Sequence, residues 1–327
     1  MKSGELLALS DVSPFRKGQE LRPVLVPASA LGGRLLNKLI TCWGRDDHFF
    51  LDARFLQATD AAGSIQVARN AGLRPIPVVA MDFGLEKVEA LAPHIQDIGR
   101  ASIRLPGTRA TGSDCEARLN SLVGMLGIPI SAIDLFVDFG VVREAVEFHR
   151  ANAVRVFEFL PRFEAWRSVY YAATSFPESV SDLEGYEEIE DGVFRIITPR
   201  VELETYQALL EAGFQRQLGF SDSSVCFGEF SAEAPPAFRP TANLRYTRGE
   251  LFIILKGVHE NGNEDMIRLC QALLTMPEYR GPAYSVGDNS IERCATTEAN
   301  YGQSQQWRRW DHNHNFEETM NQVASFA

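Results

Sequence analysis

The first half of the chain alternates short apolar runs with stretches of helical periodicity, and this alternation limits the folds that are open to it. Six runs have the continuous apolar character of strands that are buried on both faces: 22–27, 49–52, 75–81, 101–105, 133–137 and 167–174. Helical spacing or helix-capping residues fill the intervals between these runs. Strands and helices in strict alternation predict a parallel sheet whose strands are joined by right-handed helical crossovers.

Two arrangements of such strands remain open, a doubly wound open sheet and a closed barrel. Residues 217–220 and the pair 244–246 with 251–256 are further strand candidates, which bring the total to about eight. An open sheet normally carries a GxGxxG motif after its first strand, and this sequence has none there. We therefore expect an α/β fold of the (β/α)8 TIM-barrel type, with the open sheet as the alternative.

The second half is less regular, and we expect it to complete a single barrel domain over residues 1–327. Residues 176–199 are acidic and are predicted to form an irregular excursion over one face of the barrel. Residues 282–327 contain a long stretch with few apolar side chains and are predicted to form a C-terminal closing segment. That segment ends in a short helix at about 316–326.

The composition limits the possible binding partners and the cellular location, but it says little about the activity. The formal net charge of -11 argues against a non-specific grip on nucleic acid, which needs clustered Lys and Arg, although a local basic patch remains open. The odd number of cysteines and the lack of a CxxC pair predict reduced thiols rather than disulfides or a zinc ribbon: Cys42, Cys115, Cys226, Cys270 and Cys294. Without a secretory leader or an apolar run of about 20 residues, we expect a cytoplasmic protein with no membrane contact.

In α/β barrels the active site forms at the carboxyl ends of the strands, so the polar residues there are the first candidates. Asp52, Asp82 and Asp138 end or follow predicted strands and are candidate catalytic or metal-binding carboxylates, with ordinary helix capping as the alternative for Asp82 and Asp138. Cations at the same ends are predicted to share their cavity and bind a phosphate-bearing ligand: Arg54, Arg104 and Lys256. The loop 107–113 is a further candidate anion cradle, or a plain connection between strand and helix.

Residues 307–315, WRRWDHNHN, combine two aromatic rings with arginines and imidazoles. Because Arg can fork onto an anion and stack on a ring, we predict that this segment contacts a ligand at the barrel mouth through Trp307, Arg309, His312 and His314. Spacing identifies no third ligand for the two histidines, so we assign no metal site. The alternative is a polar loop before the final helix, with Asn313 or Asn315 as the helix cap.

Both ends of the sequence carry recognisable patterns. KSGELLAL at 2–9 and RPVLVP at 22–27 open it, and YSVGDNSI at 284–291 is followed by Trp307, a His-rich step and the final helix. These patterns resemble the "beta protein" family of bacteria and T4-like phages, and the likeness runs end to end. The family usually has a short strand ahead of the Lys-x-Gly-Glu step, for which this sequence leaves no room. It brings no established activity, but its members look like mobile-element or phage-conflict genes, which implies a setting in antiviral defence and a protein partner.

Two functions from different classes follow. The first is a non-catalytic recognition or accessory component of a defence system, which binds a ligand or a partner protein at the barrel mouth. The alternative is a TIM-barrel enzyme that acts on a phosphorylated or nucleotide-like substrate, with or without a metal. Since the sequence contains no GxSxG, GxxxxGK[ST] or HExxH motif, we favour the first function and assign no cofactor.

Overall fold

The computed structural model describes residues 3–142, 146–180, 183–226, 241–258, 264–297 and 302–326. These residues form two compact units. The first unit takes in Pro14–Ala173 and Glu204–Asp222, and the second takes in Lys2–Ser13, Thr174–Leu203 and Ser223–Ala327. Whether the two units act as the single domain that we expected stays a prediction.

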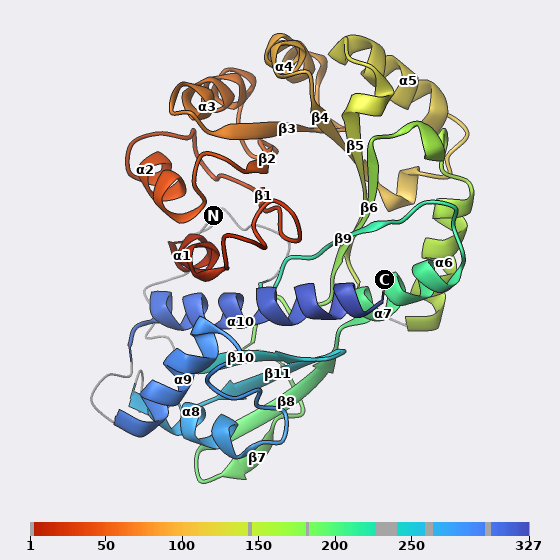
Figure 1. Ribbon diagram of the computed structural model, residues 1–327. Helices are drawn as coiled ribbons and strands as arrows, with labels where there is room; N and C mark the ends of the chain where they lie inside the picture. Colours follow the sequence, from red (N-terminus) through yellow and green to blue (C-terminus); the bar gives the residue numbers. More distant parts are fainter. Residues whose placement is uncertain are drawn as a thin grey trace. The chain divides into compact units, whose positions relative to one another are not determined.

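The first unit is built on a curled sheet with the strand order β1-β2-β3-β4-β5-β6-β9 (Figure 1). Its strands are β1 (Val24–Leu25), β2 (His48–Asp52), β3 (Arg74–Ala80), β4 (Ala101–Pro106), β5 (Ile133–Val141), β6 (Ser168–Thr174) and β9 (Gly219–Ser221). Parallel pairing joins β1 through β5 in turn, and it also joins β6 to β9. The predicted mixed α/β fold with a parallel sheet is therefore confirmed.

Closure of this sheet into an eight-stranded barrel is not confirmed. Within the described ranges β1 and β9 are the end strands of the sheet. The segments that we predicted to complete it, β10 (Asn243–Arg248) and β11 (Leu251–Lys256), pair antiparallel with each other in the second unit. Gly249 and Glu250 alone connect them, and so short a turn joins antiparallel strands but never parallel ones.

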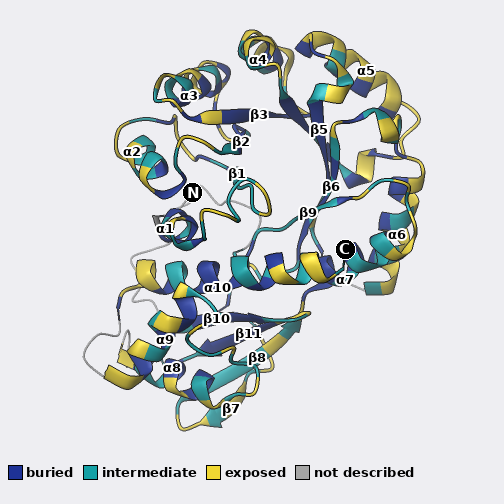
Figure 2. Cartoon of the chain, viewed as in Figure 1, coloured by how far each residue is buried: buried dark blue, intermediate teal, exposed yellow. Residues whose placement is uncertain are grey.

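Helices follow successive strands along the outer side of the curl: α2 (Gly33–Cys42), α3 (Ala58–Asn70), α4 (Leu85–Ile98), α5 (Cys115–Leu126) and α6 (Val146–Glu158) (Figure 1). Their outward residues are exposed, whereas the strands beneath them are largely buried (Figure 2). Gly99 and Gly127 take the left-handed conformation that ends α4 and α5. Short 3-10 turns complete this unit: η1 (Gly107–Arg109), η2 (Ile130–Ala132) and η3 (Phe163–Ala165).

One face of the curled sheet carries three layers of side chains, because alternate residues of a strand share a face. The middle layer is apolar and contains Phe50, Ile76, Val78 and Phe136. Two residues further along their strands come Asp52 on β2 and Asp138 on β5, and two residues back come His48 and Asp134. An apolar layer therefore separates two charged edges of the sheet.

The second unit contains an antiparallel sheet in the order β10-β11-β8-β7, with β7 (Glu187–Glu190) and β8 (Val193–Pro199). Its helices are α1 (Ser3–Asp11), α8 (Asp265–Thr275), α9 (Val286–Thr297) and α10 (Ser304–Ser325), and α7 (Val201–Glu211) begins within it. Residues from the sheet, α8, α9 and α10 form its core, among them Leu255, Leu269, Ile291 and Trp307. No helix of the described ranges is both long and apolar enough to cross a bilayer.

Two expectations for this half were wrong. The acidic stretch 176–199 is not irregular throughout, since residues 187–190 and 193–199 form β7 and β8. Residues 307–315 are not a loop, because they lie within α10, a helix of 22 residues that starts with a capping box between Gln303 and Gln306. Asn313 and Asn315 therefore lie in the interior of the helix and do not cap it. The predicted final helix at 316–326 therefore starts earlier, at Ser304, and its first half was missed because its buried face is polar.

Candidate functional site

Four of the predicted site residues meet at the carboxyl ends of β2, β4 and β5. Asp52 is fully buried and accepts hydrogen bonds from the backbone N–H of Arg54 at 3.0 Å and from its Nε at 2.9 Å. The guanidinium of Arg104 lies 3.7 Å from Asp52 and donates to Asp138 Oδ2 at 3.0 Å. We call these four residues the carboxyl edge.

The charges of the carboxyl edge cancel. Arg54 and Arg104 are engaged by Asp52 and Asp138, so a phosphate or a metal ion has to displace an existing ion pair. Lys87 lies beside this edge and donates to the carbonyl oxygen of Arg54 at 3.2 Å. Burial lowers the pKa of Lys87, and the charges of Asp52 and Asp82 oppose that shift. The edge is an internally satisfied network.

The capping alternative for Asp82 and Asp138 was wrong. Asp138 lies within β5, where its Oδ1 accepts a hydrogen bond from the backbone N–H of Gly140 at 2.8 Å. The N-cap of α4 is Gly84, with no side-chain capping bond, so Asp82 does not cap that helix. Both carboxylates owe their positions to the sheet edge and not to a helix start.

The opposite edge of the same sheet carries an excess of positive charge, which sequence reasoning missed. Arg100 donates to Asp134 Oδ2 through Nε at 3.0 Å and through Nη2 at 2.8 Å. Arg167 approaches the same carboxylate at 3.3 Å, and Asp134 is fully buried. His48 and Arg74 are register partners on β2 and β3 at this edge. We call this group the arginine edge: Arg22, His48, Arg74, Arg100, Asp134 and Arg167.

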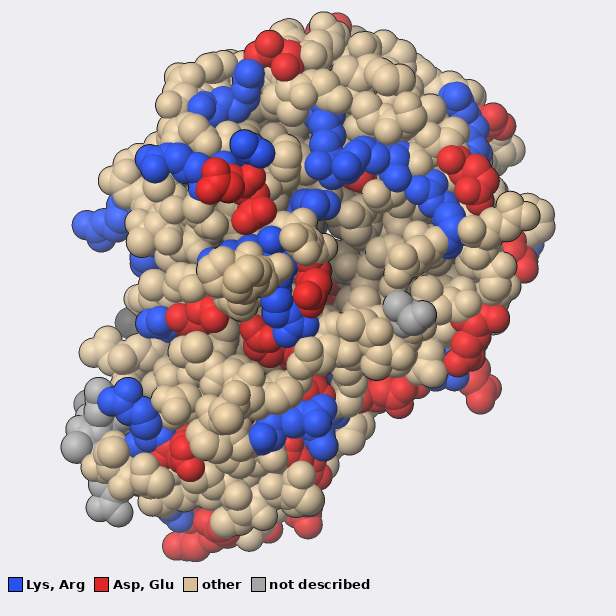
Figure 3. Space-filling view, in the orientation of Figure 1, with Lys and Arg blue, Asp and Glu red and all other residues tan. Residues whose placement is uncertain are grey.

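Electrostatic coupling shows that the arginine edge is one cluster. The pKa of His48 is lowered, first by burial and then by the charges of Arg100, Arg22, Arg74 and Arg167 in that order. The imidazole is therefore neutral at pH 7, and two of the four guanidinium groups, those of Arg100 and Arg167, contact the single carboxylate of the cluster. Figure 3 shows Lys and Arg side chains gathered along the curve of the sheet.

Several donors of the arginine edge remain available to a ligand. Arg74 is exposed, and Arg167 keeps 40% of its side chain exposed beside its long contact to Asp134. Arg22 lies over the ring of Phe50, and its Nε is buried without a hydrogen-bond partner in the described part of the chain. An orphaned buried donor costs free energy until an acceptor reaches it. The cluster is thus arranged to receive an anion.

A local signal pointed to this edge. Each of the four arginines stands at or within two residues of the start of a strand, at β1, β3, β4 and β6 respectively. The expectation of a barrel directed the search to the carboxyl ends instead, because barrel enzymes carry their chemistry there. The amino ends of parallel strands also lie together, so Arg22, Arg74, Arg100 and Arg167 could have been predicted to be neighbours.

The loop 107–113, our other anion candidate, borders a cavity in the first unit. This cavity has a volume of about 350 Å³ and is lined by residues of that loop together with Glu116, Arg155, Phe159 and Pro161. Its size suits a small ligand. It holds one arginine and one glutamate, so its lining offers less positive charge than the arginine edge.

The remaining predicted site residues belong to the second unit. Lys256 ends β11 and lies 5.3 Å from the ring of Tyr186. Trp307 is a core residue with 1% of its surface exposed, and Arg309 makes two hydrogen bonds of 2.6 Å to Asp11. Their predicted contacts with a ligand at the barrel mouth stay predictions.

His314 is fixed inside the second unit. Its Nδ1 lies 2.8 Å from Asp288 Oδ2 and its Nε2 lies 2.7 Å from the carbonyl oxygen of Thr247. Its ring stacks on Tyr246 with the centroids 3.7 Å apart. These contacts on both ring nitrogens, together with the stacking, fix the orientation of the imidazole. His312 has other partners, so the two histidines do not form a joint metal site.

One family of known proteins matches the chain. The sequence model of a family described as "Beta protein" matches residues 3–319, which is nearly the whole chain. No curated protein matches the sequence.

Proposed function

The chain belongs to the beta protein family, and on that premise we propose that it is a non-catalytic recognition protein that binds a small phosphate-bearing ligand. The observation that carries this proposal is the arginine edge, where Arg100 and Arg167 contact the buried carboxylate of Asp134 and the charges of all four arginines act on His48. A phosphate group accepts several N–H donors at once, and arginine presents them in a planar fork. The ligand site therefore lies at the amino ends of the strands.

The charge distribution favours a small ligand over a long polyanion. The whole chain carries a net charge of -11, whereas the arginine edge is positive. A nucleic acid longer than a few nucleotides would extend onto the negatively charged remainder of the surface. Its affinity would fall because the phosphates and that surface repel each other. One or two phosphate groups match the four guanidinium groups of the cluster.

The enzyme alternative receives less support. It requires free carboxylates at the carboxyl edge, but Asp52 and Asp138 are engaged by Arg54 and Arg104. A recognition role needs only that donors such as those of Arg74 and Arg167 remain accessible. We therefore propose binding without turnover.

The setting is part of the same proposal. We propose that the chain serves in a phage-conflict defence system, where a protein partner senses the ligand-bound form; the likeness to phage and bacterial genes supports this. A cytoplasmic location is supported by the five cysteines, which are all free thiols. We also propose that an eighth element closes the curled sheet, which the order of its seven strands supports.

Calorimetric titration of the full chain with pyrophosphate and with ATP tests the proposal. We expect saturable binding that weakens as salt is raised, because exposed cations are screened. Arg74→Ala and Arg167→Ala should each weaken binding about tenfold or more, since each removes a charge-assisted contact. The matched control is Arg118→Ala, an exposed arginine of α5, which should leave binding unchanged.

Three outcomes contradict this proposal. The first is the absence of binding by either probe, or binding that Arg74→Ala and Arg167→Ala leave intact. The second is a single-stranded oligonucleotide that binds more tightly than ATP with a steep salt dependence, because this makes the arginine edge a nucleic-acid surface. Turnover of either probe contradicts the non-catalytic role.

A further inference from the structure

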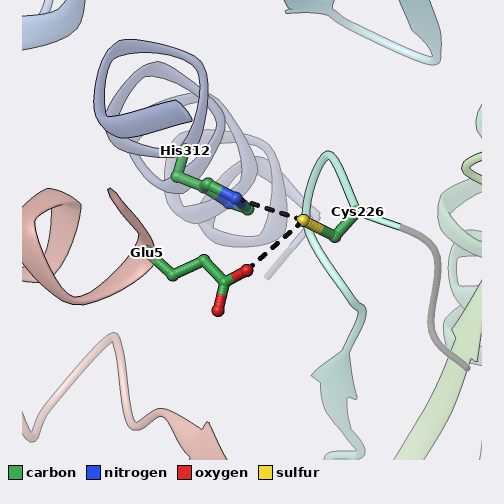
Figure 4. Close-up of side chains that lie close together, drawn as sticks. All are labelled: Glu5, Cys226 and His312. Carbon is green, nitrogen blue, oxygen red and sulfur yellow. Dashed lines mark hydrogen bonds between the residues drawn. The ribbon is translucent and has the colours of Figure 1, made fainter. Parts of the chain in front are cut away.

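Three side chains that are far apart in the sequence converge in the second unit, as Figure 4 shows. Glu5 comes from α1, Cys226 from the turn after β9, and His312 from α10. Cys226 Sγ lies 3.3 Å from His312 Nε2 and 3.7 Å from Glu5 Oε1. The three potential ligand atoms all lie within 4.8 Å of one another. This cluster shares no residue with the arginine edge, which belongs to the first unit.

These separations are those of ligands around one metal ion. Zinc binds thiolate sulfur at about 2.3 Å and imidazole nitrogen or carboxylate oxygen at about 2.1 Å, so the edges of a tetrahedral site measure about 3.5 Å. The two contacts of Cys226, at 3.3 Å and 3.7 Å, fall on either side of that value. We propose that Glu5, Cys226 and His312 bind a divalent transition metal of the zinc class and leave a fourth position for water.

The hydrogen bonds of His312 set the tautomer that metal binding needs. Ser224 donates its hydroxyl hydrogen to Asn315 Oδ1 at 2.7 Å, so its oxygen accepts from His312 Nδ1 at 2.9 Å. His312 Nε2 then carries the lone pair, and it faces Cys226. A hydrogen bond to the distal nitrogen commonly orients a metal-binding imidazole in this way. Ser224 has a φ of 56°, a left-handed conformation that serine rarely adopts, and the surrounding contacts hold it there.

Helix packing sets the position of Glu5. Gly4 comes so close to α10 that a Cβ at this position would lie 2.8 Å from Arg308 Cβ and from the carbonyl oxygen of Gln305. At the other end of α1, Asp11 accepts two hydrogen bonds from Arg309. These two contacts hold α1 against α10 and leave the Glu5 carboxylate beside Cys226.

The charge of the three ligands suits a divalent cation. A thiolate and a carboxylate carry two negative charges and the imidazole carries none, so a divalent ion makes the site neutral. Arg245 lies close enough for its charge to interact with Cys226, and it donates to the carbonyl oxygen of Val225 at 2.6 Å. The thiolate is the form of cysteine that binds metals.

The types of ligand atom limit which metals can bind at this site. Sulfur and imidazole ligands select zinc, cobalt or iron over magnesium and calcium, which prefer oxygen. His312 is 2% exposed, whereas Glu5 and Cys226 are partly exposed, so solvent reaches the ligands on one side. Three protein ligands and one solvent position are the arrangement of metal sites that activate water or bind an exchangeable ligand.

Titration of the metal-stripped full chain with Co²⁺ tests this inference, because cobalt replaces zinc in such sites and reports its ligands by absorption. We expect one ion per chain, with the visible bands of four-coordinate cobalt and a near-ultraviolet band from sulfur ligation. Cys226→Ser should remove the sulfur band, and Glu5→Gln should weaken affinity about tenfold or more. Cys115→Ser, a buried thiol of the first unit, is the matched control and should change neither.

A second readout distinguishes the metal site from a plain thiol–imidazole pair. Bound Zn²⁺ should protect Cys226 from alkylation by iodoacetamide, as measured by peptide mass spectrometry. A wild-type chain without cobalt bands overturns the inference, and so do bands that survive Cys226→Ser or alkylation that zinc leaves unchanged. Circular dichroism of each variant excludes unfolding as the cause. Failure here leaves the phosphate-binding titrations unaffected, because those depend on Arg74 and Arg167.

Discussion

Asp134 and Asp138 lie four residues apart on the same face of β5, and each accepts a hydrogen bond from an arginine 34 positions earlier in the chain. Their surroundings differ, because Asp134 is fully buried while Asp138 keeps 23% of its side chain exposed. An arginine–aspartate pair therefore contributes a different amount to folding stability at each edge of the sheet. Removing one partner of a buried pair leaves an uncompensated charge, whereas water screens an exposed one.

Replacing Asp134 with Asn should destabilise the chain far more than replacing Asp138 with Asn. We expect Asp134→Asn to cost about 3 kcal/mol, since it leaves the largely buried guanidinium of Arg100 without its fully buried partner. Asp138→Asn should cost about 1 kcal/mol or less. Urea unfolding of the two variants measures both values, and equal costs would show that burial does not distinguish these pairs.

Acid should weaken the first unit through His149. Burial lowers the pKa of His149 to about 4, and its Nε2 lies 2.9 Å from the hydroxyl of Tyr171. The unfolded chain takes up this proton near pH 6.5 and the folded chain only near pH 4, so stability is complete above the first value and falls between the two. The loss should reach about 3 kcal/mol at the lower end.

The control for this prediction is His149→Gln, which keeps a hydrogen-bonding group but cannot titrate. Its urea midpoint should fall less than that of the wild type when the pH is lowered from about 7 to about 4. The partly exposed His94 provides the comparison, and His94→Gln should retain the wild-type pH dependence. If His149→Gln loses as much stability as the wild type, another group governs the acid sensitivity.

The parallel sheet was predictable because its strands are buried on both faces. A strand such as β3, buried at every position after Arg74, appears in the sequence as an unbroken apolar run. Barrel closure was not predictable in this way, since it depends on which distant strand pairs with β1. The antiparallel pairing of β10 with β11 did have a local signal, the short turn at Gly249, but the preceding alternation led us to count both segments as barrel strands.

The candidate sites were less predictable than the fold. In α10 the residues from Asp311 to Asn315 are polar and buried in succession, so the helix lacks the apolar stripe by which helices are recognised. Glu5 and Cys226 are separated by 221 positions, and no spacing rule connects them. The sequence also does not reveal that Arg54 and Arg104 are ion-paired, because the pairing depends on side-chain geometry at the ends of the strands.

Gly219→Ala should destabilise the first unit. Gly219 on β9 is the register partner of Tyr170 on β6, and a Cβ at this position would overlap the tyrosine ring. The overlap should cost about 2 kcal/mol, as overpacking commonly does. Gly63→Ala in α3 is the matched control, since a Cβ there meets nothing within 4 Å, and it should raise stability by about 0.5 kcal/mol. A neutral Gly219→Ala, measured by urea unfolding, contradicts the close approach.

His314→Ala and Arg309→Ala should differ sharply in stability, although both residues were predicted to contact a ligand. His314 is fully buried, with both ring nitrogens hydrogen-bonded and its ring stacked on Tyr246, so we expect its loss to cost about 3 kcal/mol. Arg309 keeps 37% of its side chain exposed in its pair with Asp11, and its loss should cost about 1 kcal/mol. Thermal unfolding of the single variants measures the difference. If His314→Ala keeps the wild-type melting temperature, the imidazole is not a structural element and its predicted role in ligand binding gains support.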